Sequence, residues 1–148
     1  MRALLQRVLR AEVRVDGQTT GAIGVGLLVL LGVGPADDEA TAIALARRVT
    51  ELRIFRDTEG RTNCSVIDAE GDVLVVSQFT LFADTRRGRR PGFTGAAAPD
   101  LARRLYERFC EAVSALGPRV ARGEFGAEMA VELVNDGPFT LWLDTEDR

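Results

Sequence analysis

Length, composition and charge limit the fold and the chemistry of this chain before any motif is considered. The sequence has 148 residues, of which 46% are hydrophobic and 28% charged, values typical of one globular domain rather than of a disordered or fibrous protein. It contains no histidine, which excludes a Ser-His-Asp triad, a Cys-His pair and a histidine-based zinc site within one subunit. The 19 basic residues, all arginine, are outnumbered by 22 acids, so the net charge of -3 provides no overall attraction to nucleic acid.

Membrane and cofactor signals are also lacking in the sequence. The longest apolar run, 24–34, is well short of the roughly 20 residues that cross a bilayer, and the chain starts in patterned sequence rather than in a signal peptide. We therefore expect a cytoplasmic protein with no membrane partner. Cys64 and Cys110 have no CxxC spacing and are expected to be reduced thiols, and no metal or cofactor is expected.

The N-terminal part of the sequence has the signals of several strands followed by one helix. Asp16-Gly17 is a turn pair, and a later continuous apolar run predicts a buried central strand. Asp37-Asp38-Glu39 places negative charge at a helix start, and apolar residues then recur at helical spacing. The predicted elements are strands over 3–9, 12–15 and 27–33, a short segment up to residue 24, and a helix over 38–52.

The C-terminal part contains a second helix between strand-like segments. Pro99-Asp100 begins this helix and Gly117-Pro118 ends it. Its apolar stripe, predicted to face the core, consists of Leu101, Leu105, Phe109, Val113 and Leu116. The other predicted elements are turns over 57–60 and 68–71, a strand over 73–82, a long polar loop over 83–98, and strands over 127–134 and 139–143 joined by a turn over 135–138.

These elements together predict an α/β fold. Strands outnumber helices, tight turns join most of the strands, and one helix crosses from the first half of the sheet to the second. We expect a single domain over 1–148 with a strongly curved, barrel-like sheet, antiparallel or mixed, and two main helices. The order of the strands stays open at this point.

Polar residues at the end of the strand over 73–82 form the first candidate site. The segment 77–81 carries Ser77, Gln78 and Thr80, and an arginine-rich loop follows it. The loop concentrates positive charge where it can meet phosphates through Arg86, Arg87, Arg89 and Arg90. The alternatives are a strand end whose hydroxyls face solvent and a charged run that is only a solvated surface.

The second candidate site is Asn135-Asp136-Gly137-Pro138. Asn-Asp-Gly is a good hairpin turn, so a purely structural role is one interpretation. The Gly-Pro step supports another, because proline tolerates a cis bond and glycine removes the Cβ clash before it. Such a bend can present backbone carbonyl oxygens to an ammonium group, since Pro138 has no N–H.

These two segments resemble the signature motifs of the D-aminoacyl-tRNA deacylases of bacterial and eukaryotic type. The first motif is Ser77-Gln78-Phe79-Thr80 and the second is 135–140. Phe139 departs from the pattern, since the family commonly has valine after the Gly-Pro pair. The resemblance covers almost the whole chain, with further matching segments at 6–8, 15–17, 23–24, 26–32, 52–55, 83–85, 90–91, 125–127 and Met129.

The resemblance implies a tight homodimer with a shared site. Gly137 and Pro138 of one subunit, joined by a cis bond, would project into the other subunit's pocket, held there by Arg7. The pocket would be lined by 77–80, with Phe79 and Thr80 near the scissile ester. Ala102 matches a position close to the terminal adenosine. The predicted site residues are Ser77, Gln78, Phe79 and Thr80 for catalysis, Gly137, Pro138, Arg7, Asn135 and Ala102 for binding and chiral selection, and the four loop arginines for tRNA.

The implied reaction is hydrolysis of the ester of D-aminoacyl-tRNA, with L-amino acids rejected by collision with the Gly-Pro backbone. Glycine, which has no side chain, would also be accepted, including glycine mischarged on tRNA-Ala. No base is at hand to activate Ser77 or Thr80, so we expect the ribose 2′-hydroxyl to assist water, with the N–H groups near Phe79 and Thr80 stabilising the oxyanion. No DNA partner is expected. The alternatives are a non-catalytic RNA-binding or interaction protein and a purely structural dimer module.

Overall fold

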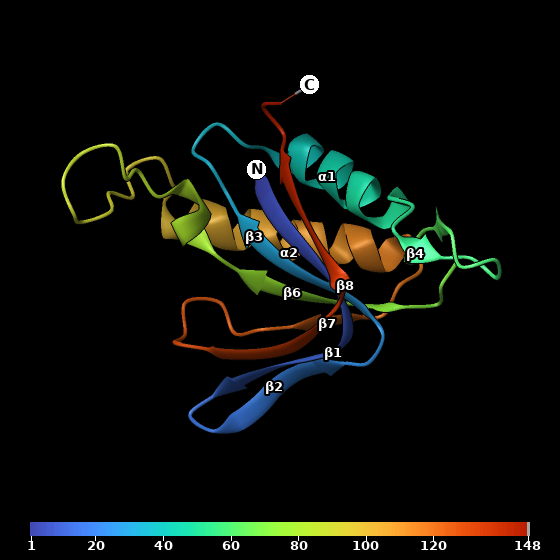
Figure 1. Ribbon diagram of the computed structural model, residues 1–148. Coiled ribbons are helices and arrows are strands. Elements are labelled where there is room, and N and C mark those ends of the chain that lie inside the picture. The colour runs from blue at the N-terminus through green and yellow to red at the C-terminus, as the bar shows by residue number, and fades with distance from the viewer. Residues whose placement is uncertain (148) are drawn as a thin grey trace.

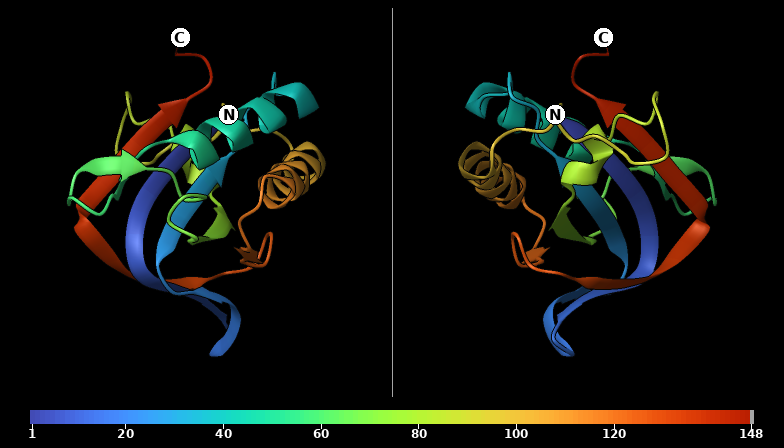
Figure 2. Two further views of the ribbon diagram at one scale, coloured as in Figure 1. Left: turned by 90° about the vertical axis from the view of Figure 1, so that its right-hand side faces the viewer. Right: turned by 90° about the vertical axis from the view of Figure 1, so that its left-hand side faces the viewer.

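Two helices cover one side of a strongly curved sheet in the computed structural model, which describes residues 1–147 (Figure 1). Figure 2 shows both helices on the same side and the hairpin of the first two strands at the far end from them. The elements are β1 (Arg2–Val15), β2 (Gln18–Ile23), β3 (Gly26–Gly32), α1 (Glu39–Glu51), β4 (Phe55–Arg56), β5 (Thr62–Cys64), β6 (Asp72–Ser77), the 3-10 turn η1 (Phe79–Phe82), α2 (Pro99–Ala115), β7 (Val120–Arg122) and β8 (Ala130–Asp144).

The long strand β1 is the centre of the sheet. β3 pairs with its first half and β2 with its last residues, while β8 pairs along nearly the whole of its other edge. The order is β2-β1-β3-β6-β7, with β8 added to β1. The β3–β6 and β6–β7 pairs are parallel and the rest of this sheet is antiparallel. The predicted α/β fold with a mixed sheet is therefore confirmed.

The curvature of the sheet brings β2 close to β7. A side chain at Gly21 would collide with the carbonyl of Arg122, so the absence of a Cβ allows this approach. A register shift between Val13 and Arg14 adds to the bend of β1. The sheet consequently comes near to closing into a barrel, as predicted.

Both faces of β3 and β6 are buried, which explains why these strands are apolar runs rather than alternating segments. Val29 and Val75 lie in the cluster that includes Phe109 of α2. Leu28 and Leu74 point the other way, into a second cluster inside the curve of the sheet. The helices therefore cover one face and the curvature covers the other.

The helices begin where the sequence placed their capping signals. The Asp38 side chain accepts a hydrogen bond from the Thr41 N–H at 2.8 Å, which caps α1 and lowers the pKa of Asp38. α2 has Pro99 in its first turn and is followed by Gly117 with a φ of 126°. Both predicted helices are confirmed.

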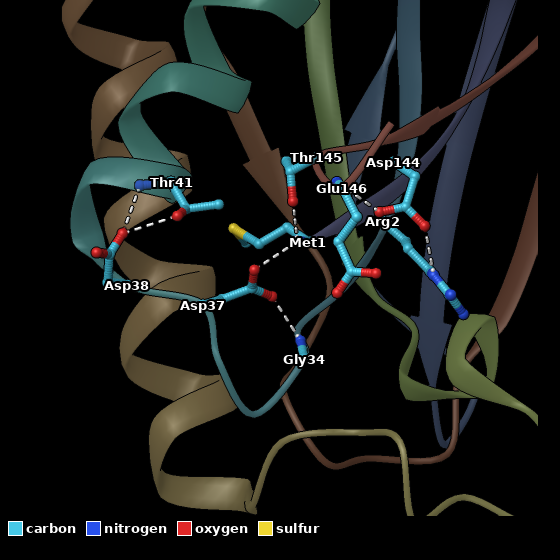
Figure 3. A network of polar contacts seen from close by, with 9 residues as sticks. All are labelled: Met1, Arg2, Gly34, Asp37, Asp38, Thr41, Asp144, Thr145 and Glu146. Carbon is cyan, nitrogen blue, oxygen red and sulfur yellow. Dashed lines mark hydrogen bonds and ion pairs between the residues drawn. The ribbon is translucent and has the colours of Figure 1, made fainter. Parts of the chain in front are cut away.

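A polar network joins the start of β1 to the start of α1 and the end of β8 (Figure 3). The α-amino group of Met1 donates to Asp37 Oδ1 at 2.6 Å and to the hydroxyl of Thr145. The other carboxylate oxygen of Asp37 accepts from the Gly34 N–H at 2.6 Å. Because Met1 is buried, these bonds fix the start of β1 and the end of β8 beside α1.

The two cysteines are free thiols, as predicted, and Cys110 is buried on α2. Its burial raises the pKa of the Cys110 thiol to about 11, which keeps it protonated at neutral pH. No helix among residues 1–147 combines the length and the apolar character needed to cross a membrane.

Two predicted strand boundaries are corrected by the structure. Segments 3–9 and 12–15 form one strand, β1, because a strand can bend through register shifts without breaking. The strand over 73–82 ends at Ser77, since the Gln78 N–H makes a last bond to Leu31 O at 2.8 Å and the chain then enters η1. The short strands β4, β5 and β7 were not predicted, because two or three residues carry no measurable periodicity.

A third correction concerns the C-terminal strands. The segments predicted over 127–134 and 139–143 are one strand, β8, and 135–138 is not a hairpin turn. Residues on both sides of this segment pair with β1 in the same antiparallel direction. Asn, Asp, Gly and Pro favour sharp bends of every kind. The same residues can therefore form a short excursion, in which the chain leaves a strand and returns to it, as well as a hairpin turn that reverses the chain direction.

Candidate functional site

One cavity of about 510 Å³ lies between the end of β6, the start of α2 and the segment before β8. A volume of this size is typical of small-molecule sites. Its wall is mainly apolar, with Ser77 and Gln78 as polar side chains. Apolar residues of the wall include Val33, Val76, Phe93, Phe125, Met129 and Val131.

The cavity brings together four of the predicted site residues. Ser77, Gln78 and Phe79 reach it from the end of β6, and Ala102 reaches it from the first turns of α2. The Ala102 N–H donates to Ala98 O at 2.9 Å, which shows that α2 is already helical at this point. Thr80, which was predicted beside them, is exposed and is not part of the wall.

The turn η1 forms the edge of the cavity. Phe79 is 55% exposed and meets Phe93 edge-on, with ring centroids 5.0 Å apart. The amide Nε2 of Gln78 donates to Thr80 Oγ1 at 2.5 Å. Within residues 1–147 the N–H groups of Phe79 and Thr80 have no hydrogen-bond acceptor. The turn therefore offers an aromatic surface and two free donors side by side.

No titratable side chain lines the cavity in the described part of the chain. The one tyrosine of the sequence, Tyr106, is buried outside the cavity wall; its hydroxyl donates to Val75 O at 2.8 Å, and burial raises its pKa. Residues 1–147 also contain no group of three or more His, Cys, Asp or Glu side chains placed to hold a metal ion. The cavity therefore offers neutral side chains and backbone groups to a ligand.

Four residues of β8, 136–139, leave the ladder opposite Arg7. Thr140 pairs with Gln6 and Asn135 with Val8, so the four stand against one residue of β1. The Asn135 side chain closes the base of this excursion. Its Nδ2 donates to Arg7 O at 2.9 Å and to Phe139 O at 3.0 Å, and its Oδ1 accepts from the Phe139 N–H at 3.2 Å.

Arg7 packs beneath the same excursion and is only 3% exposed. Its Nη1 donates to Ile54 O at 2.5 Å, and its guanidinium carbon lies 4.9 Å from the centre of the Phe139 ring. Its Nε lies 3.1 Å from Asp136 Oδ2, but the N–H does not point at an acceptor, so this contact is an ion pair without an aligned hydrogen bond. Arg7 thus connects the excursion to the segment before β4.

Gly137 and Pro138 form the tip of the excursion, and both are exposed. The peptide bond between them is cis. Neither residue lines the cavity of its own chain. The two predicted motifs are therefore separate within one subunit.

The arginine-rich loop is exposed and is closed by a pair of backbone bonds. Asp84 N donates to Gly92 O at 2.7 Å and Gly92 N to Asp84 O at 2.9 Å. Arg86 forms two side-chain bonds to Asp84, which lower the pKa of that carboxyl. In the described part of the chain no ion pair involves the other three arginines, Arg87, Arg89 and Arg90. Three of the four predicted charges are therefore available to a partner.

Comparison with known proteins decides the family. The model of the family described as D-Tyr-tRNA(Tyr) deacylase matches residues 4–144. The chain belongs to the D-Tyr-tRNA(Tyr) deacylase family. A relative from Ruegeria sp. (strain TM1040), named D-aminoacyl-tRNA deacylase, is 59% identical over 148 residues, which are 100% of this chain and 95% of the relative. One of the same name from Deinococcus radiodurans is 58% identical over 144 residues, 97% of this chain and 99% of the relative.

Solved structures share the fold of this D-Tyr-tRNA(Tyr) deacylase family member. One named c-Myc DNA Unwinding Element Binding Protein is 38% identical with a TM-score of 0.93, covering 98% of this chain and 99% of the other. One described as a probable eukaryotic D-amino acid tRNA deacylase is 21% identical with a TM-score of 0.83, covering 96% and 97%. The family predicted from the sequence is confirmed. Members of this family are deacylases, so the predicted hydrolase class is confirmed with it.

Sequence reasoning missed part of the cavity wall of this family member. The resemblance included 125–127 and Met129 but gave them no role, whereas Phe125 and Met129 line the cavity. Phe93 was missed altogether, because one aromatic residue in a polar loop has no periodic signal. A phenylalanine within the polar loop that follows a signature motif is the sequence signal that points to it.

Replacing Asn135 by alanine tests how firmly this family's second motif is held. All three bonds at the base of the excursion are lost, so we expect the free energy of unfolding to fall by about 1–3 kcal/mol. We also expect the Phe139 amide to exchange faster with deuterium. Gln18→Ala, at an exposed amide side chain of β2, is the control and should change stability by less than about 0.5 kcal/mol. If urea unfolding shows equal losses of unfolding free energy in Asn135→Ala and in the control, the three bonds of Asn135 do not stabilise the excursion.

Proposed function

We propose that this chain hydrolyses the ester bond of D-aminoacyl-tRNA and releases the free D-amino acid and tRNA. The observation that carries this proposal is the meeting of Ser77, Gln78 and Phe79 with Ala102 around one cavity, in a member of a deacylase family. The cavity is large enough for a nucleoside bearing an amino acid. Activity on tRNA would place the protein in the cytoplasm, where translation occurs.

We further propose that the enzyme distinguishes D from L by rejection. Three points fix the substrate: backbone oxygens hold the ammonium, the segment 77–80 holds the ester, and Ala102 contacts the terminal adenosine. An L side chain would then collide with the backbone of Gly137 and Pro138. A ten-thousandfold preference needs about 5.5 kcal/mol, which collision with a rigid backbone supplies more readily than a lost apolar contact of about 1–3 kcal/mol.

The rigidity that such rejection requires has support in the contacts of the excursion. Asn135 closes its base with three hydrogen bonds. Arg7, almost fully buried, packs under Gly137 so closely that a Cβ there would lie 3.1 Å from Nη2. A loop held from both sides cannot move aside at low cost when a side chain meets it.

The chemical step is proposed to use water activated by the ribose 2′-hydroxyl. No titratable side chain lines the described cavity, so no base is in place to turn Ser77 or Thr80 into a nucleophile. The free N–H groups of Phe79 and Thr80 are suited to the oxyanion that forms when water attacks the ester carbonyl. Thr80 then has a positioning role through its bond with Gln78.

A homodimer would bring Gly137 and Pro138 to the cavity that they do not reach in their own chain. The outer edge of β8 supports such an assembly, because β8 pairs only with β1 among the described residues and so has an open edge. Exposed apolar side chains on β1 and β8 also support a contact between two subunits: Leu9, Val134 and Trp142. The loop arginines 87, 89 and 90 would meet tRNA phosphates outside the cavity.

Binding of DNA is a second candidate, favoured by the similar structure that is named as a DNA unwinding element binding protein. The net charge of -3 argues against broad attraction to duplex DNA. This alternative predicts binding to duplex DNA with no release of amino acid from tRNA. A non-catalytic RNA-binding protein predicts retention of D-aminoacyl-tRNA with the ester intact.

The direct test uses four charged tRNAs and follows release of labelled amino acid. We expect rapid hydrolysis of D-tyrosyl-tRNA and of glycyl-tRNA, including glycine on tRNA-Ala, and about ten-thousandfold slower hydrolysis of L-tyrosyl-tRNA. Spontaneous hydrolysis without protein is the control. Intact D-tyrosyl-tRNA would refute the proposed function, and resistance of glycyl-tRNA would refute rejection as the selective step.

A paired experiment separates substrate assistance from a protein nucleophile. Thr80→Ala should keep at least about a tenth of the wild-type kcat, whereas tRNA ending in 2′-deoxyadenosine should lose about a hundredfold, because the assisting hydroxyl is gone. Single-turnover rates measure both, with circular dichroism to verify folding. Loss of all activity in folded Thr80→Ala would assign Thr80 as the nucleophile.

Mixing two inactive variants tests whether the site is shared between subunits. Gly137→Leu places a side chain against Phe139 and Arg7 in the excursion, and Phe79→Ala alters the cavity edge. Random exchange of subunits makes half of the dimers mixed, each with one complete site, so about a quarter of wild-type activity should return. A mixture that stays inactive, although mass spectrometry shows mixed dimers, would mean that each chain builds its own site.

A further inference from the structure

The turn η1 carries part of the first signature motif but has little internal support. It has four residues, none of them buried, and its N-cap residue Gln78 makes no capping bond from its side chain. Backbone bonds at its ends join Leu81 N to Gln78 O at 3.2 Å and Ala83 N to Thr80 O at 3.0 Å. A short 3-10 turn of this kind is easily displaced unless other parts of the protein hold it.

Arg2, at the start of β1, is hydrogen-bonded to this turn. Its Nη1 donates to Leu81 O at 3.0 Å, a carbonyl at the end of the turn, and its Nε donates to Asp144 Oδ2 at 2.8 Å. Figure 3 shows the Arg2 side chain joined to Asp144 and extending towards the ribbon of η1. Burial raises the pKa of Asp144, but hydrogen bonds from the Glu146 N–H and from Arg2 outweigh it, and the pKa lies below its usual value. Asp144 is thus a charged anchor on β8.

An aromatic ring of the turn completes the contact. The guanidinium carbon of Arg2 lies 4.3 Å from the centre of the Phe82 ring and 5.9 Å from that of Trp142. Phe82 also packs on the end of β3 and the residues after it. A Cβ at Gly32 or at Gly34 would lie 3.1 Å from this ring, so the two glycines leave the space that it fills.

We propose that Arg2 is a positioning residue for ester hydrolysis, which it serves by fixing η1 and with it Phe79 and Thr80 at the cavity edge. This inference rests on the proposed function. Arg2 does not line the cavity, so it acts through the turn rather than on the substrate. Because α2 holds Ala102 independently, loss of Arg2 should disturb the ester more than the adenosine. A misplacement of about 1 Å at a reacting group can reduce a rate by about a hundredfold.

The contact needs an arginine. One planar group donates in two directions, to the Leu81 carbonyl and the Asp144 carboxylate, while its face rests on Phe82. The ammonium of a lysine is a point donor without a flat face. Arg2→Lys therefore keeps the charge opposite Asp144 and loses the hold on the turn.

The test compares Arg2→Met and Arg2→Lys with Arg10→Met in deacylation of D-tyrosyl-tRNA. Arg10 is a matched control, since it joins the same two strands through Glu132, with Nη1 to Oε1 at 2.6 Å, and has no contact with η1. We expect kcat to fall at least about tenfold in both Arg2 variants, with KM within about twofold of wild type. Arg10→Met should keep the wild-type kcat.

Hydrogen exchange at the Leu81 and Ala83 amides gives a second readout that does not depend on activity. Both amides should exchange faster than in the wild type in the Arg2 variants, and their exchange rates should be unchanged in Arg10→Met. If Arg2→Met fails to fold, Arg2→Lys decides the question. The inference would be overturned if the folded Arg2 variants had the same kcat and the same amide exchange rates as Arg10→Met. A wild-type protein without deacylase activity would instead refute the proposed function, and the exchange rates would still show whether Arg2 holds the turn.

Discussion

The antiparallel pairing of β8 with β1 is the interaction on which the arrangement of this molecule depends. Pairing continues on both sides of 136–139, so the excursion is anchored at each end and cannot swing like a free loop. The same register places Asp144 opposite Arg2 at one end of the strand pair. Without this ladder the second motif would be an ordinary flexible loop, and Arg2, which binds the turn at the end of the first motif, would lose its partner Asp144.

In the proposed site, catalysis would depend on geometry rather than on acid–base groups, because no titratable side chain of the described chain lines the cavity. Backbone donors do not change protonation between pH 5 and 9, and the phenol and thiol that lie deeper, Tyr106 and Cys110, have raised pKa values because they are buried. Rate and selectivity in such a site depend on how well positions are held. The supports outside the cavity therefore matter as much as its wall.

The parts of the fold that depend on local pattern could be predicted from the sequence, and the parts that depend on pairing could not. Asp38 and Pro99 identified the helix starts, because capping and charge act within one turn. The segment 135–138 misled, because its bend chemistry is the same in a hairpin and in an excursion, and only the partner strand distinguishes them. The motif resemblance found Ser77 to Phe79 and Ala102, whereas Phe93 meets Phe79 only through the fold.

Two arginines of β1 make contacts of the same kind. Arg2 contacts the carbonyl of Leu81, the carboxylate of Asp144 and the ring of Phe82. Arg7 contacts the same three kinds of group: the carbonyl of Ile54, the carboxylate of Asp136 and the ring of Phe139. In each case β8 supplies the carboxylate and another segment supplies the carbonyl. A planar cation with several donors can join three partners at once, which a lysine cannot. One strand thereby fixes both motifs, the cavity edge through Arg2 and the exposed Gly-Pro tip through Arg7, so their relative positions follow from the geometry of β1.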